Sequence, residues 1–105
     1  MADLNDFFNN YLPNKLAGNP DLAKEVNAIY VFDLDGFGQW TVDLTDGNGT
    51  VSEGAHDDAG CTVTAKSSDF ESLLDNPSSG MMLFTMGKLK VTNVALALSL
   101  QKILS

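Results

Sequence analysis

The sequence predicts an α+β fold in which a largely antiparallel sheet has helices on one face. Three observations predict it. The middle of the chain has short segments in which apolar and polar residues alternate, as in strands with one buried face. Both outer parts have apolar residues at helical spacing. Glycine-rich turns separate the segments and no linker or repeat interrupts them, so residues 1–105 are predicted to form a single domain.

The first predicted element is an amphipathic helix that begins after Asp3. Its apolar residues recur at the spacing of one helix face, namely Leu4, Phe7, Phe8, Tyr11 and Leu12. Asp3 has the side chain of an N-cap, and Pro13 is compatible with a further helical turn. Residues 18–20, Gly-Asn-Pro, predict a break, after which residues 21–26 are expected to add a short helix.

Four strands are predicted in the middle of the chain. Residues 28–35 are rich in β-branched and aromatic side chains and stop at a Gly-Phe-Gly turn. Residues 39–45 place their large apolar side chains on one face, namely Trp40, Val42 and Leu44. Residues 46–49, Asp-Gly-Asn-Gly, predict a hairpin loop that leads to a short strand at 50–53. Residues 61–65 form the fourth strand, in which threonines alternate with Cys61, Val63 and Ala65.

The rest of the chain predicts two helices, a fifth strand and a last helix. A serine and a glutamate three positions apart, at 68 and 71, form a capping-box pattern for a helix that carries Phe70, Leu73 and Leu74. Residues 77–86 predict a Met-rich helix that Gly87 ends. Residues 88–92 alternate as the fifth strand, and residues 93–104 predict the last helix.

The composition indicates an acidic globular protein. Fourteen Asp and Glu stand against six Lys, no Arg is present, and the net charge is -8. Nucleic-acid binding needs cationic side chains that displace counterions, so no nucleic-acid partner is expected. The charge also argues against standing attachment to an anionic membrane, which usually requires a polybasic patch, and it favours a monomer.

Cysteine usage and the first residues of the chain bear on the compartment. Cys61 is the only cysteine, which excludes an internal disulfide. The first residues lack the basic and apolar regions of a signal peptide, and the apolar runs are far shorter than a membrane span. We therefore expect a cytoplasmic protein.

Two groups of residues suggest a metal site at first sight. Asp33 and Asp35 stand beside a glycine, but neither this turn nor the turn at 43–48 has the spacing of a calcium loop, and hairpin turns need these residue types. His56 lies near Cys61, which is on the inward strand face and is interpreted as a small core thiol. No metal, cofactor or catalytic residue is expected, and the chain is predicted not to be an enzyme.

Three segments, taken in order, carry a family resemblance. Residues 40–51 read Trp-Thr-Val-Asp-Leu-Thr-Asp-Gly-Asn-Gly-Thr-Val, residues 61–64 with 68–70 follow, and residues 86–93 read Met-Gly-Lys-Leu-Lys-Val-Thr-Asn. Beyond the third segment come Leu96, Leu100 and Gln101. Together they resemble the signature hairpin, the next strand and helix, and the C-terminal motif of the sterol carrier protein two-like domain. The resemblance covers about residues 3–104.

This resemblance implies a five-stranded mixed sheet with helices covering one face and a hydrophobic tunnel between them. The tunnel would hold a sterol, a fatty acid, a fatty acyl-CoA or a phospholipid, so lipid is the expected partner, with transient membrane contact. The family has no catalytic residues and no cofactor; it binds and moves lipids. A protein-protein interaction or dimerisation domain that uses the Met-rich C-terminal helices stays open as the alternative.

The side chains predicted to line the tunnel come from five parts of the chain. They are Phe8, Tyr11 and Leu12 in the first helix, Trp40 as the floor, Phe70 and Leu74 in the middle helix, Met81, Met82, Phe84 and Met86 in the Met-rich helix, and Val94 and Leu98 in the last helix. Methionine suits irregular cavities because it is flexible and polarizable. Plain core packing is the alternative interpretation of the same residues.

Four polar residues near the predicted tunnel have two readings each. Ser99 or Gln101 would meet the polar end of a lipid, or they are simply polar positions on an exposed helix face. Lys88 and Lys90 are interpreted as solvating an edge strand, with contact to a coenzyme A phosphate as the alternative.

Overall fold

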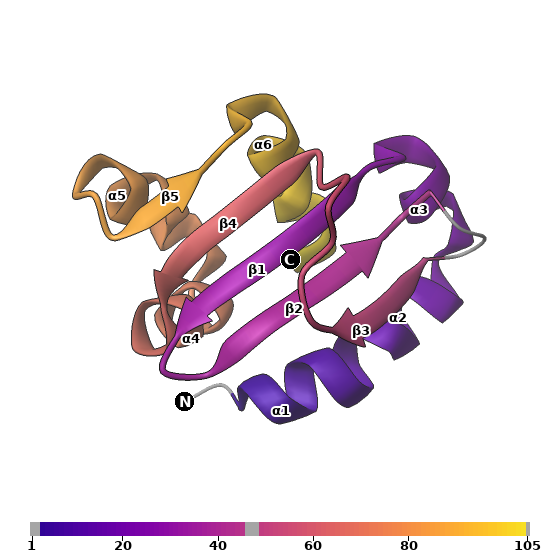
Figure 1. The fold of residues 1–105 in the computed structure, drawn as a ribbon, viewed down its shortest axis with the longest axis horizontal. Helices are drawn as coiled ribbons and strands as arrows, with labels where there is room; N and C mark the ends of the chain where they lie inside the picture. Colours follow the sequence, from indigo (N-terminus) through magenta and orange to yellow (C-terminus); the bar gives the residue numbers. More distant parts are fainter. Residues whose placement is uncertain (1–2, 46–48, 105) are drawn as a thin grey trace.

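The computed structural model of the chain describes residues 3–45 and 49–104. Its five strands form one sheet in the order β3-β2-β1-β4-β5 (Figure 1). Their bounds are β1 Ile29–Asp35, β2 Gly38–Asp43, β3 Thr50–Glu53, β4 Cys61–Lys66 and β5 Leu89–Val91. β1 and β4 run parallel, and the other neighbours are antiparallel. The mixed, mostly antiparallel five-stranded sheet is therefore confirmed.

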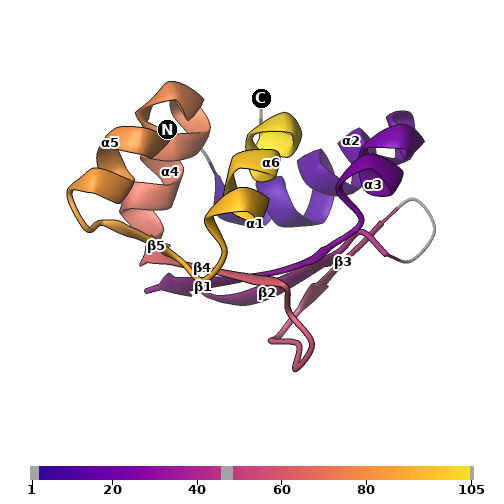
Figure 2. The ribbon, with the colours of Figure 1, turned by 90° about the horizontal axis from the view of Figure 1, so that it is seen from above.

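The helices lie on one face of this sheet (Figure 2). Before β1 come α1 Leu4–Asp6, the π-helical turn η1 Phe7–Tyr11, α2 Leu12–Gly18 and α3 Pro20–Val26. After β4 come α4 Ser67–Asp75, the 3-10 turn η2 Pro77–Ser79, α5 Gly80–Thr85 and α6 Val94–Leu104. Figure 2 shows α4 and α5 at one end, α6 in the middle, and α2 and α3 at the other end. Within the described ranges, every helix is too short or too polar to cross a bilayer.

The predicted N-terminal helix is a continuous run of α1, η1 and α2. The Asp3 carboxylate accepts hydrogen bonds from the backbone amides of Asn5 and Asp6 at 3.0 and 3.3 Å, which confirms the N-cap. In η1 the Leu12 amide bonds to the carbonyl of residue 7, five positions before it. A wider turn relieves the clash that the ring of Pro13 would make with the preceding turn, so the proline does not end the helix.

The predicted capping box at Ser68 is wrong. β4 continues in extended backbone to Lys66, and α4 begins directly at Ser67, so Ser68 lies inside the first turn. The Ser68 carbonyl accepts a hydrogen bond from the Ser72 hydroxyl at 3.1 Å. The end of the strand sets the start of this helix, and no side-chain cap is needed.

The Met-rich helix begins later than predicted. Residues 77–79 form η2, and the α-helix starts at Gly80. Gly87 ends α5 as predicted: its φ of 77° is left-handed, and the Lys88 amide closes the last turn on the Leu83 carbonyl at 2.9 Å. Of the hairpin loop predicted at residues 46–49, residues 46–48 lie outside the described residues.

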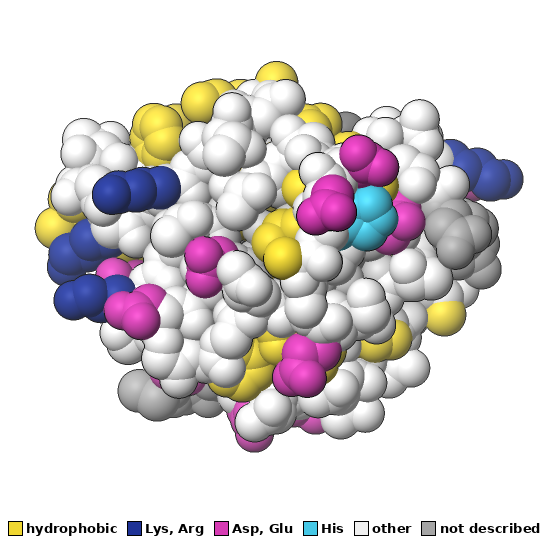
Figure 3. Space-filling view, in the orientation of Figure 1, with side chains coloured by type: hydrophobic (Ala, Val, Ile, Leu, Met, Phe, Trp, Pro, Cys, Tyr) yellow, Lys and Arg dark blue, Asp and Glu magenta, His cyan; other side chains and the backbone are white. Residues whose placement is uncertain are grey.

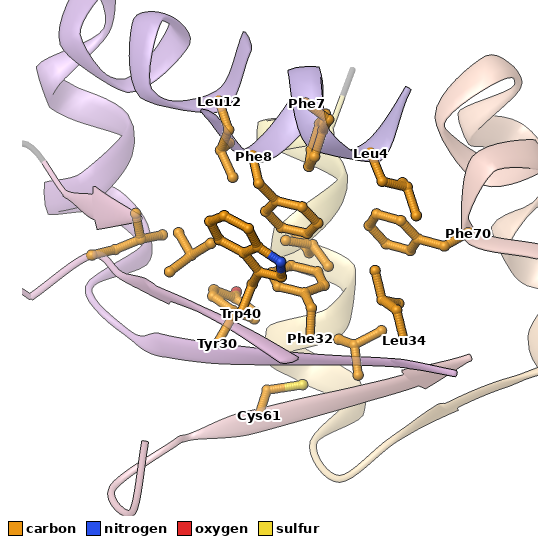
Figure 4. Packing of buried hydrophobic residues seen from close by; sticks show 14 of the residues in the cluster. Leu4, Phe7, Phe8, Leu12, Tyr30, Phe32, Leu34, Trp40, Cys61 and Phe70 are labelled. Atoms are coloured by element: carbon orange, nitrogen blue, oxygen red, sulfur yellow. The ribbon is translucent and has the colours of Figure 1, made fainter. Parts of the chain in front are cut away.

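An aromatic part of the core lies beneath the N-terminal helix (Figure 4). The Phe8 ring stacks on the Trp40 indole, with 5.0 Å between centroids and 10° between planes. Phe8 is also nearly parallel to Phe70 at 6.2 Å, and it meets Phe32 edge-on at 5.5 Å. Offset and edge-on geometries of this kind are the favourable ones for aromatic pairs.

Residues 54–60 join β3 to β4 across the face of the sheet that carries no helix (Figures 1 and 2). The Gly54 amide donates to the Gln39 carbonyl at 2.8 Å, and the Thr41 hydroxyl donates to the Gly54 carbonyl at 2.7 Å. Val31 and Thr41 point to this face, yet both are buried. The face predicted to be solvated is therefore partly covered.

Candidate functional site

An apolar pocket lies between α5 and α6, above β4 and β5. Its floor and back consist of Val63, Leu73, Leu89 and Val91. Its walls are formed on the α5 side by Gly80, Met81 and Phe84, and on the α6 side by Val94, Ala97, Leu98 and Leu100. None of these side chains can donate or accept a conventional hydrogen bond, so the side chains offer a surface suited to hydrocarbon. Its cavity volume is about 110 Å³.

The floor of the pocket follows from the strand period. Val63 of β4 pairs with Val91 of β5, and Ala65 pairs with Leu89, so these inward side chains share one face. Gly80 sets how closely α5 approaches α4, because a Cβ atom at this position would lie 3.1 Å from the Leu73 Cδ1 atom. A larger residue there would narrow the pocket.

The α6 wall is fixed to the sheet at its base. The Thr62 amide donates to the Thr92 hydroxyl at 2.9 Å, and the Thr92 amide donates back to the Thr62 carbonyl at 3.2 Å. The Asn93 side chain then caps the helix by accepting from the Leu96 amide at 3.1 Å. The base of α6 is therefore held in one position.

A buried tyrosine adds a further tie to this wall. The Tyr30 hydroxyl donates to the Leu96 carbonyl at 2.6 Å. Burial, with a smaller contribution from the charge of Cys61, raises the pKa of Tyr30 to about 12. The hydroxyl therefore keeps its proton and remains a donor over the whole neutral range.

Both walls of the pocket have exposed apolar side chains at the rim. Met81 is 63% exposed and Phe84 is 42% exposed. On the opposite rim, Val94 and Leu98 are 53% and 52% exposed. The pocket is thus open to the surface, with large apolar side chains around its mouth. The enclosed tunnel that the sequence predicts stays a prediction.

The structure brings together four of the twelve predicted lipid-binding residues. Met81, Phe84, Val94 and Leu98 line the pocket. Met82 in α5 and Met86, the C-cap directly after it, lie four residues apart on a different side of the helix and are also exposed. Their contact with a lipid stays a prediction.

The other predicted residues lie under or near the N-terminal helix. Buried in the aromatic part of the core are Phe8, Leu12, Trp40 and Phe70. Leu74 is partly buried against the core, and Tyr11 is 45% exposed with the Lys15 amine 5.8 Å from its ring centroid. Trp40, the predicted floor, stacks on Phe8, whereas β4 and β5 supply the floor of the pocket.

Seven lining residues were absent from the prediction. They are Val63, Leu73, Gly80, Leu89, Val91, Ala97 and Leu100. The alternating apolar residues of β4 and β5 can be recognised in the sequence. Assigning them to the floor of one pocket also requires knowing that these two strands are neighbours in the sheet. Of the predicted polar contacts, the Ser99 hydroxyl donates to the Ala95 carbonyl of its own helix at 3.4 Å, and the side chain of Gln101 lies outside the part that the structure describes.

The groups that suggested a metal site have other roles. Within residues 3–45 and 49–104, no three His, Cys, Asp or Glu side chains are grouped to hold a metal ion. The His56 Nδ1 atom accepts a hydrogen bond from the Asp58 amide at 3.0 Å. Cys61 is fully buried, and burial raises the pKa of its thiol, which confirms a core thiol.

The sequence is similar to a known protein family. Residues 8–105 match the model of the SCP-2 sterol transfer family. Sterol carrier protein 2 of Homo sapiens is 36% identical over an alignment of 87 residues, and the match covers 77% of this chain and 16% of the human protein. The chain therefore spans about a sixth of the length of that relative.

Solved structures show the same fold. Sterol carrier protein 2 of Yarrowia lipolytica, in its apo form, has a TM-score of 0.75 and 31% identity, and the match covers 94% of this chain and 81% of that one. The palmitated SCP2L2 of Aedes aegypti, solved by NMR in solution, has a TM-score of 0.70 and 17% identity, with coverage of 94% and 92%. The second likeness concerns the fold alone.

Proposed function

This chain belongs to the SCP-2 sterol transfer family, and on that premise we propose that it carries one long-chain lipid in the pocket between α5 and α6. The proposal rests on the lining of the pocket, in which every side chain is apolar and the rim is about half exposed. Covering apolar surface contributes roughly 25 cal/mol per Å², so an acyl chain that covers this lining is stabilised there.

The chemistry of the lining favours one orientation of the ligand. A carboxylate or hydroxyl buried in the pocket would lose its hydrogen bonds to water and find no side-chain partner. The polar end of the lipid therefore stays at the mouth, and the hydrocarbon end enters. A long-chain fatty acid meets this requirement directly, and the palmitated SCP2L2 of Aedes aegypti is a protein of the same fold that holds such a chain. Sterols, fatty acyl-CoA and phospholipids are the other proposed cargoes.

The size of the pocket requires it to widen when a lipid binds. Its volume of about 110 Å³ is below the roughly 300–1,000 Å³ of small-molecule sites. The base of α6 is held by hydrogen bonds to β4 and β1, so we assign the widening to α5. The flexible side chain of Met81 allows the wall to adapt to chains of different shape.

We propose carriage of lipid rather than catalysis for this chain. The activities of longer relatives belong to those proteins, since the chain spans only 16% of the human protein. The cytoplasmic location, the monomeric state and the single domain all stay predictions.

Displacement of a fluorescent fatty acid tests the proposal. Leu98→Glu places a charge at the mouth and removes apolar lining, so the affinity should fall about tenfold or more, as expected for the lost contact of one leucine. Ala95→Glu, an equal change in charge at an exposed position of α6 outside the lining, is the matched control and should leave the affinity unchanged. Native mass spectrometry of the purified protein should show one bound lipid. Absence of saturable displacement in the folded wild-type protein would refute the proposal.

The second candidate is an interaction or dimerisation domain. Met82 and Met86 favour it, because they are 60% and 56% exposed and lie outside the pocket lining. Light scattering after size-exclusion chromatography separates the two candidates. A tight dimer that binds no fatty acid would support this second function, and a monomer that binds one would support lipid carriage.

A further inference from the structure

The charges of this protein are segregated along the chain. All fourteen Asp and Glu lie within residues 1–75, together with three lysines. Residues 76–105 contain three lysines and no acidic residue. The protein as a whole is strongly acidic, yet this one segment is cationic. The same segment forms α5, β5 and α6, which make most of the pocket wall.

The fold gathers part of this cationic segment at one edge of the sheet. Lys88 and Lys90 are exposed at β5, and Lys90 is opposite the uncharged Thr64 in the pairing of β4 with β5. Lys66 at the end of β4 is less isolated, because Asp35 of β1 is its partner in the parallel pair. Figure 3 shows dark blue side chains at the β5 end of the molecule, with magenta acidic and yellow hydrophobic side chains beside them.

Exposed apolar side chains border these lysines. Met86 is 56% exposed and is separated from Lys88 only by the Gly87 turn. Met82, one turn earlier in α5, is 60% exposed. Neither methionine lines the pocket, so a lipid within the pocket would leave them exposed. Large apolar side chains next to lysines are typical of a surface that enters the headgroup region of an anionic membrane.

We propose that the α5–β5 edge, defined by Met82, Met86, Lys88 and Lys90, docks on the surface of an anionic lipid bilayer. The lysines would contact the headgroups and the methionines would enter the interface between headgroups and acyl chains. With this edge on the membrane, the α5 wall of the pocket, which includes Met81 and Phe84, lies close to the bilayer, so a lipid has a short path between the two. The inference rests on the proposed lipid carriage.

The acidic remainder of the molecule supports this orientation. An anionic surface repels residues 1–75 and attracts the α5–β5 edge. The electrostatic field of the membrane therefore orients the protein before contact. Because only a few lysines take part, the attachment is brief, which agrees with the expectation that standing attachment needs a polybasic patch. The same charges would also make binding decrease as salt increases.

Co-flotation of the full chain with vesicles tests the proposal. The wild-type protein should float with vesicles of phosphatidylcholine and phosphatidylglycerol at low salt, and it should stay unbound with phosphatidylcholine alone. Lys88→Glu and Lys90→Glu should each weaken binding at least about fivefold, as expected for one lysine near an anionic surface. Lys24→Glu on α3, at the other end of the molecule, makes the same change in net charge and should have little effect. Met86→Ser should weaken binding by a smaller factor.

Three outcomes would overturn the proposal. They are equal binding to neutral and anionic vesicles, an equal loss for Lys24→Glu and Lys90→Glu, and a dimer in which the α5–β5 edge is covered by a second copy. Fatty-acid displacement in solution separates this inference from the proposed function. Loss of vesicle binding by Lys90→Glu with retained fatty-acid binding supports both proposals. A fourth outcome, a wild-type protein that binds fatty acid but no anionic vesicle, would refute the docking and leave the proposed lipid carriage standing.

Discussion

The two ends of this molecule cover the same sheet in different ways. Under the N-terminal helix, rigid aromatic rings stack on one another, with Phe8 between Trp40 and Phe70 (Figure 4). Above β4 and β5, flexible side chains such as Met81 leave a pocket that opens to the surface. Close packing specifies one structure, whereas thioether side chains adapt to different contacts. We infer that the aromatic end contributes most of the stability of the fold, and that the end with the pocket provides the space for a ligand.

The largest expected effect separates the two ends by stability. Phe8→Ala removes the ring at the centre of the aromatic stack and should lower the free energy of unfolding by about 3–5 kcal/mol. Met81→Ala, at a position 63% exposed, should change it by less than about 1 kcal/mol. Urea titration followed by circular dichroism measures both values. Similar decreases in the free energy of unfolding for the two variants would contradict this difference between the two ends.

A smaller effect is expected at the boundary between the ends. Tyr30→Phe removes the hydrogen bond to the Leu96 carbonyl while keeping the ring, and it should lower the free energy of unfolding by about 0.5–1.5 kcal/mol. Hydrogen exchange of the α6 amides should become faster, because the helix loses one tie to β1. Unchanged exchange in α6 would mean that this hydrogen bond does not hold the wall.

The same tyrosine predicts a pH dependence. Its pKa is raised by burial to about 12, whereas an unfolded tyrosine has a pKa of about 10. Below pH of about 10 both states keep the proton, and the stabilisation is fully present. Between these two pKa values the unfolded state releases the proton first, so the free energy of unfolding decreases as pH rises. Tyr30→Phe should lack this component, and thermal unfolding of both proteins at several alkaline pH values compares them.

The smallest expected effect on stability concerns Gly80. Gly80→Ala adds a methyl group 3.1 Å from the Leu73 Cδ1 atom, the end of a side chain that can shift. The gain in helix propensity should raise the free energy of unfolding by up to about 1 kcal/mol. The narrower pocket should bind fatty acid more weakly. A more stable variant with unchanged affinity would show that α5 already moves away from Gly80 when lipid binds.

Local patterns in the sequence predicted much of the fold. Period-two alternation placed Trp40 and Val63 on the inward face, because alternation is a property of neighbours in the chain. The capping pattern at Ser68 failed because the end of β4 decides where α4 begins. The family resemblance, and not the pattern of any one segment, supplied the mixed five-stranded sheet.

The candidate site was harder to predict than the fold. The sequence shows that Phe8 and Phe84 are apolar and lie on helices, but it does not show at which end of the sheet each helix lies. Phe84 lines the pocket, and Phe8 lies in the aromatic stack. The floor residue Leu89 depends on the pairing of β5 with β4, a contact between segments more than twenty positions apart. Such contacts leave no periodic signal.

The parallel pairing of β1 with β4 has a consequence for folding. β1 and β2 are joined by a tight turn, so they can pair early, whereas β4 reaches β1 only after the chain crosses the sheet and closes a longer loop. β5 adds to β4 and therefore forms later still. We expect the half of the molecule that holds the pocket to be the last part to assemble and the first to open in native-state hydrogen exchange. A bound lipid would then act as the last packing element of the fold, and it would slow exchange most in β5 and α5.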